Sequence, residues 1–344
     1  MIDLRSDTVT LPSNQMKKFI IDSPLGDDVY GEDPSVNLLQ EKIAKIFNKE
    51  AALFVPSGTM ANLIAVLTHC DRGDEVLLGD KSHIFYYEAG GISAFGGIHS
   101  FQLKNNDDGT INLNDIETSI RATGNDHFPK TKLICLENTH NACYGAPIDA
   151  DYFNEVKQIA DKHNLSIHLD GARIFNASIA LNKSVDELTR HCDTISCCLS
   201  KGLSAPVGSV ILGNKDFILK AKHMRKALGG GMRQAGLIAS AGIFSLDYMI
   251  NRIADDHSNA KELASQLNKI KNIKNNPEKV YTNILFIYNR HHEISNAKLL
   301  NELEKKNIKI DYKGNSKFRL VTHSGFTKND IGSVVKVFKE ILKD

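Results

Sequence analysis

The chain has 344 residues with 42 basic and 41 acidic side chains, and its formal net charge at pH 7 is +1. This balance, without a long block of one sign, argues against a nucleic-acid footprint and against a polybasic membrane anchor. Charges interrupt the opening segment MIDLRSDTVTLP, and no apolar run approaches the roughly 20 residues that span a bilayer. We expect a cytoplasmic protein that acts on a small molecule and binds neither nucleic acid nor a membrane.

From about residue 35 to residue 250, short apolar segments alternate with segments of helical spacing. This alternation is typical of an α/β fold with a mostly parallel sheet. Seven strands are expected, at 51–57, 75–80, 97–103, 132–138, 165–170, 194–200 and 208–213. The helices expected between them cover 37–47, 60–70, 152–163 and 185–192.

The pattern changes near residue 250, where a long polar helix is expected over 251–273. Strand and helix segments then alternate, at 283–289, 294–306, 308–312 and 317–324, and a helix closes the chain. We expect a large domain over 1–250, whose N-terminal arm 1–35 contributes to the site, and a small α+β domain over 251–344.

The cysteines include no CxxC pair, and several lie in apolar segments that resemble strands. We expect buried free thiols rather than disulfides or a zinc site. The histidines and carboxylates do not fall at ligand spacing on one helix, so no metal site is expected.

Three segments carry residues that suit a phosphorylated cofactor. In VPSGTMAN a strand leads directly into a helix, so the backbone N–H groups of Gly58 and Thr59 could hold a phosphate, although an ordinary capped helix has the same pattern. In IHLDGARIF, Asp170 ends a strand and Arg173 follows it; a structural Asp–Arg pair is the alternative. Lys201, in LSKGLSAPVGS, follows another strand, and alone it would more often be a solvated loop residue than a Schiff-base amine.

The carboxyl ends of parallel strands meet at one edge of a sheet, so these residues are expected to face one crevice. A phosphate cradle, a carboxylate and a lysine are what pyridoxal phosphate (PLP) requires, because the lysine forms the aldimine and the carboxylate keeps the pyridine nitrogen protonated. We therefore predict a PLP site at Gly58, Thr59, Asp170 and Lys201, with Arg173 at the phenolic oxygen.

Longer segments resemble the low-specificity L-threonine aldolases, which are PLP enzymes of the aspartate-aminotransferase fold (fold type I). They are MIDLRSDTVTLP, GDDVYGEDP, PSGTMAN, SHIFYYEAGG, LENTHN, HLDGARIFNA, CLSKGLSAPVGS, GGGMRQAG and RLVTHSG, in the family's order. Agreement of many independent motifs is more specific than SGT or DGAR alone. The resemblance implies reversible retro-aldol cleavage of L-threonine or L-allo-threonine to glycine and acetaldehyde, through a quinonoid carbanion.

The resemblance also implies roles for residues that spacing alone does not single out. His83 corresponds to the histidine that stacks on the cofactor ring, and it is the candidate base for the substrate hydroxyl. His127 corresponds to a second histidine near that hydroxyl. The groups expected to bind the substrate are Ser6 and Arg319, which hold its carboxylate, together with Tyr30 and Tyr87.

Arg233 and Lys226 correspond to residues that reach the cofactor phosphate from a neighbouring subunit. The resemblance therefore implies shared active sites in a homotetramer, a dimer of dimers. Two segments depart from the family pattern: ACYGAPID, where many relatives have paired glycines, and Tyr87, where an aromatic of another kind is often found. The first departure bears on local loop geometry and substrate breadth, and the second bears on the pocket near the substrate's methyl group.

Three alternatives to an aldolase remain open. A β-eliminating lyase or a hydroxymethyltransferase-like enzyme would use the same carbanion chemistry. A non-catalytic PLP-binding scaffold would be expected to lack the lysine, the aspartate or the carboxylate-binding arginine, and this chain has Lys201, Asp170 and Arg319. A cofactor-free Schiff-base aldolase is the third.

Overall fold

A seven-stranded sheet forms the centre of the computed structural model, which describes residues 1–122 and 124–343. Its strands stand in the order β2, β8, β7, β6, β5, β3, β4. They are β2 Ala51–Val55, β3 Glu75–Gly79, β4 His99–Leu103, β5 Thr131–Glu137, β6 Ser166–Asp170, β7 Thr194–Cys198 and β8 Ser209–Gly213. Each overlaps a strand expected from the sequence, so the predicted α/β fold is confirmed.

The sheet is parallel except at β8. Strand β8 runs antiparallel to β2 and β7, whereas β7, β6, β5, β3 and β4 are parallel to one another. The carboxyl ends of the parallel strands therefore lie at one edge of the sheet, the usual position of a ligand crevice in this architecture. Asp170 ends β6 at that edge.

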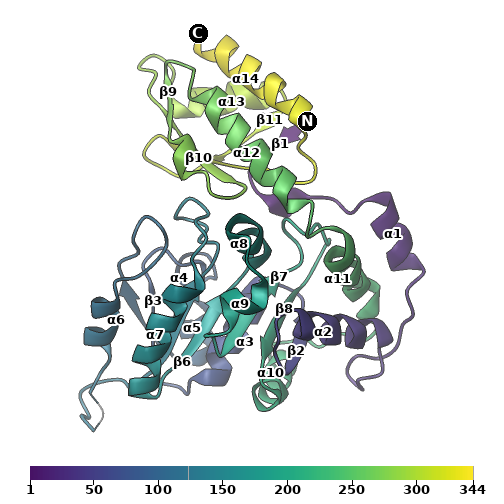
Figure 1. Ribbon diagram of the computed structural model, residues 1–344, viewed down its shortest axis with the longest axis vertical. Coiled ribbons are helices and arrows are strands. Elements are labelled where there is room, and N and C mark those ends of the chain that lie inside the picture. Colours follow the sequence, from purple (N-terminus) through teal and green to yellow (C-terminus); the bar gives the residue numbers. More distant parts are fainter. Residues whose placement is uncertain (123, 344) are drawn as a thin grey trace.

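Helices cover both faces of the sheet (Figure 1). Along β3, Leu77 belongs to one hydrophobic cluster and Val76 and Leu78 to another, because alternate residues of a strand point to opposite faces. The helices around the sheet are α1 Asn14–Ile21, α2 Pro34–Ile46, α3 Gly58–His69, α4 His83–Tyr86, α5 Gly91–Gly96, α6 Leu113–Ser119, α7 Ala150–His163, α8 Ile174–Leu181, α9 Val185–Thr189, α10 Lys215–Ala227 and α11 Gly236–Tyr248. We refer to this sheet and its helices as the large domain.

The residues from α12 onward build a second, smaller layer, here called the small domain. Its antiparallel sheet has the order β12, β13, β10, β9, and helices pack on it. Its elements are α12 Ile253–Leu267, β9 Ile273–Asn275, β10 Ile284–Asn289, α13 Asn296–Lys305, β11 Ile308–Lys309, β12 Asp311–Tyr312, β13 Lys317–Val321 and α14 Lys328–Leu342, with a 3-10 turn at Pro277–Lys279. The expected polar helix thus ends at Leu267, and the last residue of the chain lies outside the described residues.

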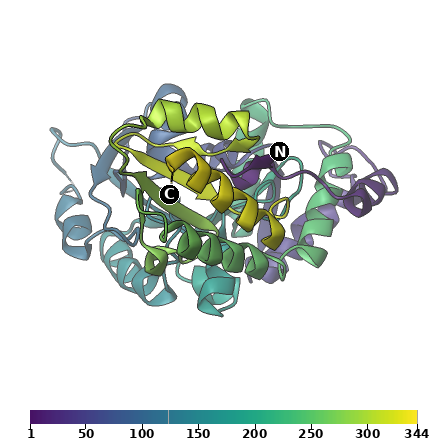
Figure 2. The same cartoon turned by 90° about the horizontal axis from the view of Figure 1, so that it is seen from above.

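The start of the chain joins the small domain (Figure 2). Strand β1, Ile2–Asp3, pairs in parallel with β11, and Leu4 is fully buried in the small-domain core. The chain then passes through a 3-10 turn at Asp7–Val9 to helix α1 of the large domain. The N-terminal arm therefore links the two layers.

All six cysteines are buried and free, as expected from the sequence. In the part of the chain that the structure describes, no helix is long and apolar enough to cross a membrane.

Asp33 anchors the segment before α2 to the start of α11. Its carboxylate accepts hydrogen bonds from the backbone N–H groups of Val36 (3.0 Å), Gly236 (2.9 Å) and Gly26 (3.2 Å). The side chain is fully buried, so each of these donors depends on it.

Replacing Asp33 by alanine should lower the free energy of unfolding by roughly 2–4 kcal/mol, because two buried N–H groups and one partly buried N–H group lose their acceptor. Urea unfolding measures this loss. Ser295→Ala is the matched control: Ser295 caps α13 through a single bond to Lys298 N, and its removal should cost about 1 kcal/mol. Equal losses in the two variants would contradict the anchoring role of Asp33.

Candidate active site

The candidate site lies at the sheet edge where β6 and β7 end. Lys201 follows β7 in a tight turn, where its carbonyl accepts hydrogen bonds from the Ser204 N–H (2.8 Å) and the Thr10 hydroxyl (3.2 Å). Thr10 belongs to the N-terminal arm, so the arm packs directly on the lysine loop. The charge of Lys201 lowers the pKa of Asp170, so the two predicted residues lie near each other at this edge.

Asp170 is buried, yet its surroundings favour the ionised carboxylate. It accepts hydrogen bonds from the Asn62 amide (2.9 Å) and from the backbone N–H of Ala172 (3.0 Å). Burial alone would raise the pKa of Asp170, but Lys201 and His83, together with these hydrogen bonds, lower it below its ordinary value. Asp170 is therefore a fixed negative charge inside the protein.

His83 opens helix α4 and lies beside a second buried carboxylate. Its Nδ1 forms a hydrogen bond with Oε1 of Glu88 at 2.9 Å. Burial opposes the charged imidazole, but the bond to Glu88 and the charge of Asp170 raise the pKa of His83. Burial also raises the pKa of Glu88. Imidazole and carboxylate can therefore share a proton.

The Asn62 side chain connects these groups. Its NH₂ group donates to Asp170 (2.9 Å) and to Glu88 (2.8 Å), and its oxygen accepts from the Ser196 hydroxyl (2.7 Å). His83, Glu88 and Asp170 each place a ligand atom within 4.8 Å of the others, a spacing that a metal ion could also use. The amide hydrogens, however, point at both carboxylates and would oppose a cation, so the group suits a hydrogen-bonded site better.

Helix α3 begins beside this edge. Its N-cap, Ser57, accepts the Met60 N–H at 3.2 Å, and the first N–H groups of a helix have no acceptor within it. A Cβ added to Gly58 would lie only 2.6 Å from Cys198 Sγ, so glycine lets the helix approach the end of β7. The predicted phosphate cradle at Gly58 and Thr59 is thus next to the strand that leads to Lys201.

Arg173 pairs with Asp7 of the N-terminal arm rather than with Asp170. Its Nε and one terminal nitrogen each donate to the Asp7 carboxylate at 2.7 Å, and Asn283 donates to the same carboxylate at 3.1 Å. Burial alone would raise the pKa of Asp7, but Arg173, Lys201 and Asn283 lower it far below its ordinary value. Arm, large domain and small domain therefore meet at one carboxylate.

Arg319, expected to hold the substrate carboxylate, is fixed by three hydrogen bonds. They run to Asn141 Oδ1 (2.6 Å), Asp311 Oδ2 (3.0 Å) and the Arg5 carbonyl (3.0 Å). Its Nε is buried without a partner among the described residues. Burial and the nearby Arg173 lower the pKa of Arg319, so an incoming carboxylate would relieve an unfavourable environment.

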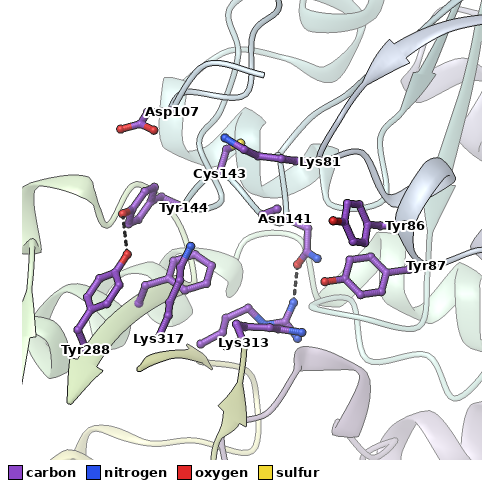
Figure 3. Close-up of a pocket in the computed structure, with 13 residues that line it drawn as sticks. Lys81, Tyr86, Tyr87, Asp107, Asn141, Cys143, Tyr144, Tyr288, Lys313 and Lys317 are labelled. Carbon is purple, nitrogen blue, oxygen red and sulfur yellow. Dashed lines mark hydrogen bonds between the residues drawn. The ribbon is translucent and has the colours of Figure 1, made fainter. Parts of the chain in front are cut away.

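Ser6 and Tyr87 lie near these groups. The Ser6 hydroxyl accepts the Thr8 N–H (3.2 Å) and lies 3.4 Å from Asp7 Oδ1, which puts it next to the buried ion pair. The ring of Tyr87 lies 5.4 Å from that of His83, and together with Arg319 it lines a cavity between the domains (Figure 3).

His127 does not reach the site of its own chain. It is exposed in the loop before β5, and the seven residues of β5, at about 3.3 Å each, separate this loop from Glu137 at the site edge by roughly 20 Å. Arg121 holds the loop at the opposite edge, because it pairs with buried Glu75 and stacks 5.5 Å from the Phe128 ring centre.

Tyr30, Arg233 and Lys226 lie on the surface. Tyr30 is 75% exposed, and the Arg233 guanidinium lies 5.8 Å from its ring centre while pairing with Asp27 at 3.0 Å. Lys226 is also exposed, near the end of α10. Like His127, these residues are directed outward.

Four residues of the site were not singled out by the sequence: Asp7, Asn62, Glu88 and Glu137. Glu137, the last residue of β5, accepts from the backbone N–H groups of His83 (2.7 Å) and Asn141 (2.8 Å), and so fixes two loops of the site. All four stand inside the motifs quoted above, but their partners are distant in the sequence.

The residues present fit PLP. A buried aspartate that stays ionised suits the pyridine nitrogen, a lysine stands beside it, and a helix N-terminus faces the same edge. The unpartnered Nε of Arg319 suits a substrate carboxylate.

Asp7→Asn should destabilise the protein by roughly 3–5 kcal/mol near neutral pH, because it leaves the Arg173 charge buried and unpaired. Since folding lowers the pKa of Asp7, this stabilisation is present above the unfolded-state value, near 3.8, and is lost as the pH falls below it. Urea unfolding at several pH values should therefore show a difference in the free energy of unfolding between wild type and Asp7→Asn, and this difference should become smaller below about pH 4. The control Glu117→Gln, at a partly exposed carboxylate of α6 that pairs with Lys162, should differ little from wild type in the free energy of unfolding. A difference between wild type and Asp7→Asn that does not change with pH would contradict the assignment.

Residues 3–290 match the family described as beta-eliminating lyase. The chain is 46% identical to low-specificity L-threonine aldolase 1 of Arabidopsis thaliana, over 99% of this chain and 96% of that protein. It is 42% identical to the low specificity L-threonine aldolase of Escherichia coli K12, with 99% of each chain covered. The solved structure of Leishmania major threonine aldolase shares the fold, with a TM-score of 0.82 at 19% identity, over 99% of this chain and 100% of that one. With this identity along nearly its whole length, the chain belongs to the family of low-specificity L-threonine aldolases.

Proposed function

We propose that this protein is a PLP-dependent aldehyde-lyase that cleaves L-threonine and L-allo-threonine reversibly to glycine and acetaldehyde. One observation carries the proposal: Lys201, the ionised and buried Asp170, and His83 converge at the carboxyl edge of the sheet. The relatives named low-specificity L-threonine aldolase support the reaction and the substrate.

The chain's own residues would hold the cofactor as follows. Lys201 would bind its aldehyde carbon, Asp170 would pair with its pyridine nitrogen, and His83 would stack on its ring. Gly58 and Thr59 would bind its phosphate. When bound, PLP supplies an electron sink for the bond that breaks at the substrate's Cα. Arg173 would reach the phenolic oxygen while it keeps its ion pair with Asp7.

Arg319 and Ser6 would orient the substrate by its carboxylate. Arg319 is rigid because Asn141, Asp311 and the Arg5 carbonyl already hold it, so little freedom is lost when a carboxylate binds its unpartnered Nε. This anchoring would fix the rotation about the substrate's N–Cα bond, and so would set the Cα–Cβ bond perpendicular to the cofactor ring, as cleavage requires.

His83 would take the proton of the 3-hydroxyl group. In a neutral imidazole that donates Nδ1–H to Glu88, the other ring nitrogen, Nε2, carries no proton and can act as a base. Glu88 is a positioning residue, since it sets the tautomer and orientation of the ring without touching the substrate.

Neighbouring subunits would complete the site in a homotetramer. The outward direction of Tyr30, Lys226, Arg233 and His127 supports contributions across subunit contacts: the phosphate for Lys226 and Arg233, the substrate for Tyr30, and the 3-hydroxyl for His127. The hydrophobic clusters support a domain division near residue 250, with the arm 1–35 shared between the two domains. We place the enzyme in the cytoplasm.

Lys201→Ala tests the proposal most directly. The wild-type protein should be yellow, with an absorbance band that borohydride removes, and should release acetaldehyde from L-threonine without 2-oxobutanoate or ammonia. The variant should bind PLP weakly and lose turnover by roughly a thousandfold or more. Near-normal turnover would overturn the assignment of Lys201, and 2-oxobutanoate with ammonia would identify the β-eliminating alternative.

Glu88→Gln should shift the pH profile of kcat/KM. Burial lowers the pKa of His83, but the hydrogen bond to Glu88 raises it above its ordinary value. Loss of the Glu88 carboxylate should therefore lower the pKa of His83 and move the acidic limb of the profile to lower pH by roughly one unit. The rate at the optimum should fall, and Glu88→Asp should recover part of it. An unshifted acidic limb would indicate a merely structural role for Glu88.

A further inference from the structure

A cavity between the domains extends beyond the groups expected to hold threonine. It encloses about 440 Å³, and Tyr87 and Arg319 form part of its wall. Because the Tyr87 ring lies 5.4 Å from the His83 ring, the cavity begins beside the expected positions of the substrate's carboxylate and side chain. This volume suits a ligand group far larger than threonine's methyl group.

The cavity lining is strongly basic. Of its described lining residues, one is acidic, Asp107, and four are cationic: Lys81, Lys313, Lys317 and Arg319. Asp107 is already paired with Lys279 at 2.7 Å. Asp311, behind the wall, pairs with both Lys313 (2.7 Å) and Arg319 (3.0 Å). The nearby carboxylates are therefore satisfied by other cations.

Lys81 and Lys317 are the cations that remain. Among the described residues neither forms an ion pair with a carboxylate: Lys81 Nζ donates to the Asn105 carbonyl at 3.3 Å, and Lys317 Nζ lies 3.9 Å from the Phe286 ring centre. In Figure 3 the Lys317 side chain rises across the cavity toward Lys81.

The hydroxyls of Tyr144 and Tyr288 lie 3.3 Å apart at the same cavity. Two amino groups that form no ion pair among the described residues, together with two hydroxyl groups around one space, favour an anion.

We propose that this cavity receives an anionic side chain, so that the enzyme also cleaves 3-hydroxy-2-amino acids whose side chain ends in a carboxylate or a phosphate. The inference rests on the proposed retro-aldol function and extends its substrate class. The 3-hydroxyl proton passes to His83, the Cα–Cβ bond breaks with its electron pair on Cα, and Cα gains a proton. The products are glycine and an aldehyde that carries the anionic group.

The test compares neutral and anionic substrates that share a four-carbon chain, using the holoenzyme. The neutral substrates are L-threonine and 4-hydroxy-L-threonine; the anionic ones are 3-hydroxy-L-aspartate and the 4-phosphate ester of 4-hydroxy-L-threonine. Lys81→Met and Lys317→Met should each lower kcat/KM for an anionic substrate roughly tenfold relative to the neutral ones. The cleavage of L-threonine should change little. Lys305→Met, on the surface of α13, is the charge-matched control and should leave the ratio unchanged.

The outcomes separate the two proposals. A drop confined to the carboxylate or to the phosphate substrate identifies which anion the cavity takes, whereas an unchanged ratio in both lysine variants overturns the inference. Failure of the wild type to cleave L-threonine would instead overturn the proposed function. Calorimetry with inorganic phosphate gives an independent readout: the holoenzyme should bind it more tightly than the Lys81→Met/Lys317→Met double variant, and equal affinities would overturn the inference.

Discussion

The site depends on keeping one carboxylate ionised inside the protein. Burial raises the pKa of Asp170 and so disfavours its charged form. The carboxylate stays ionised because Lys201, His83 and two hydrogen-bond donors stabilise the negative charge. The donor Asn62 is itself fixed by a buried network, in which His168 bonds to the Asn62 oxygen at 3.1 Å and burial holds the pKa of His168 at about 3. A neutral histidine beneath the amide thus adds no charge that would compete for Asp170.

A second buried charge ties the site to the whole architecture. The Asp7 carboxylate joins Arg173 of the large domain and Asn283 of the small domain, while Leu4, three residues earlier, lies in the small-domain core. Arg319 extends this connection, because it bonds to the Arg5 carbonyl. The groups expected to bind the substrate therefore hold their positions only when arm and domains are assembled, and the basic cavity lies at the same junction.

Much of the candidate site could be predicted, because its residues follow strand ends or open helices. Such positions are visible in the alternation of apolar segments, and parallel strands bring their carboxyl ends together at one edge. The partners of these residues could not be predicted in this way. Nothing in the local pattern links Glu88 to His83, Glu137 to two loops, or Asp7 to Arg173, since each contact depends on how separate elements pack.

The sequence by itself determined the seven strands, the α/β class and the chemistry expected of Lys201 and Asp170, because hydrophobic periodicity and short motifs are local properties. The tertiary structure decided which residues share a site. It placed His127 at the opposite edge of the sheet from Lys201. It also placed Lys81 and Lys317 at one cavity, which no sequence motif predicts. Those outcomes depend on packing between distant segments, because strand direction and domain contacts, not residue spacing, determine which residues come into contact.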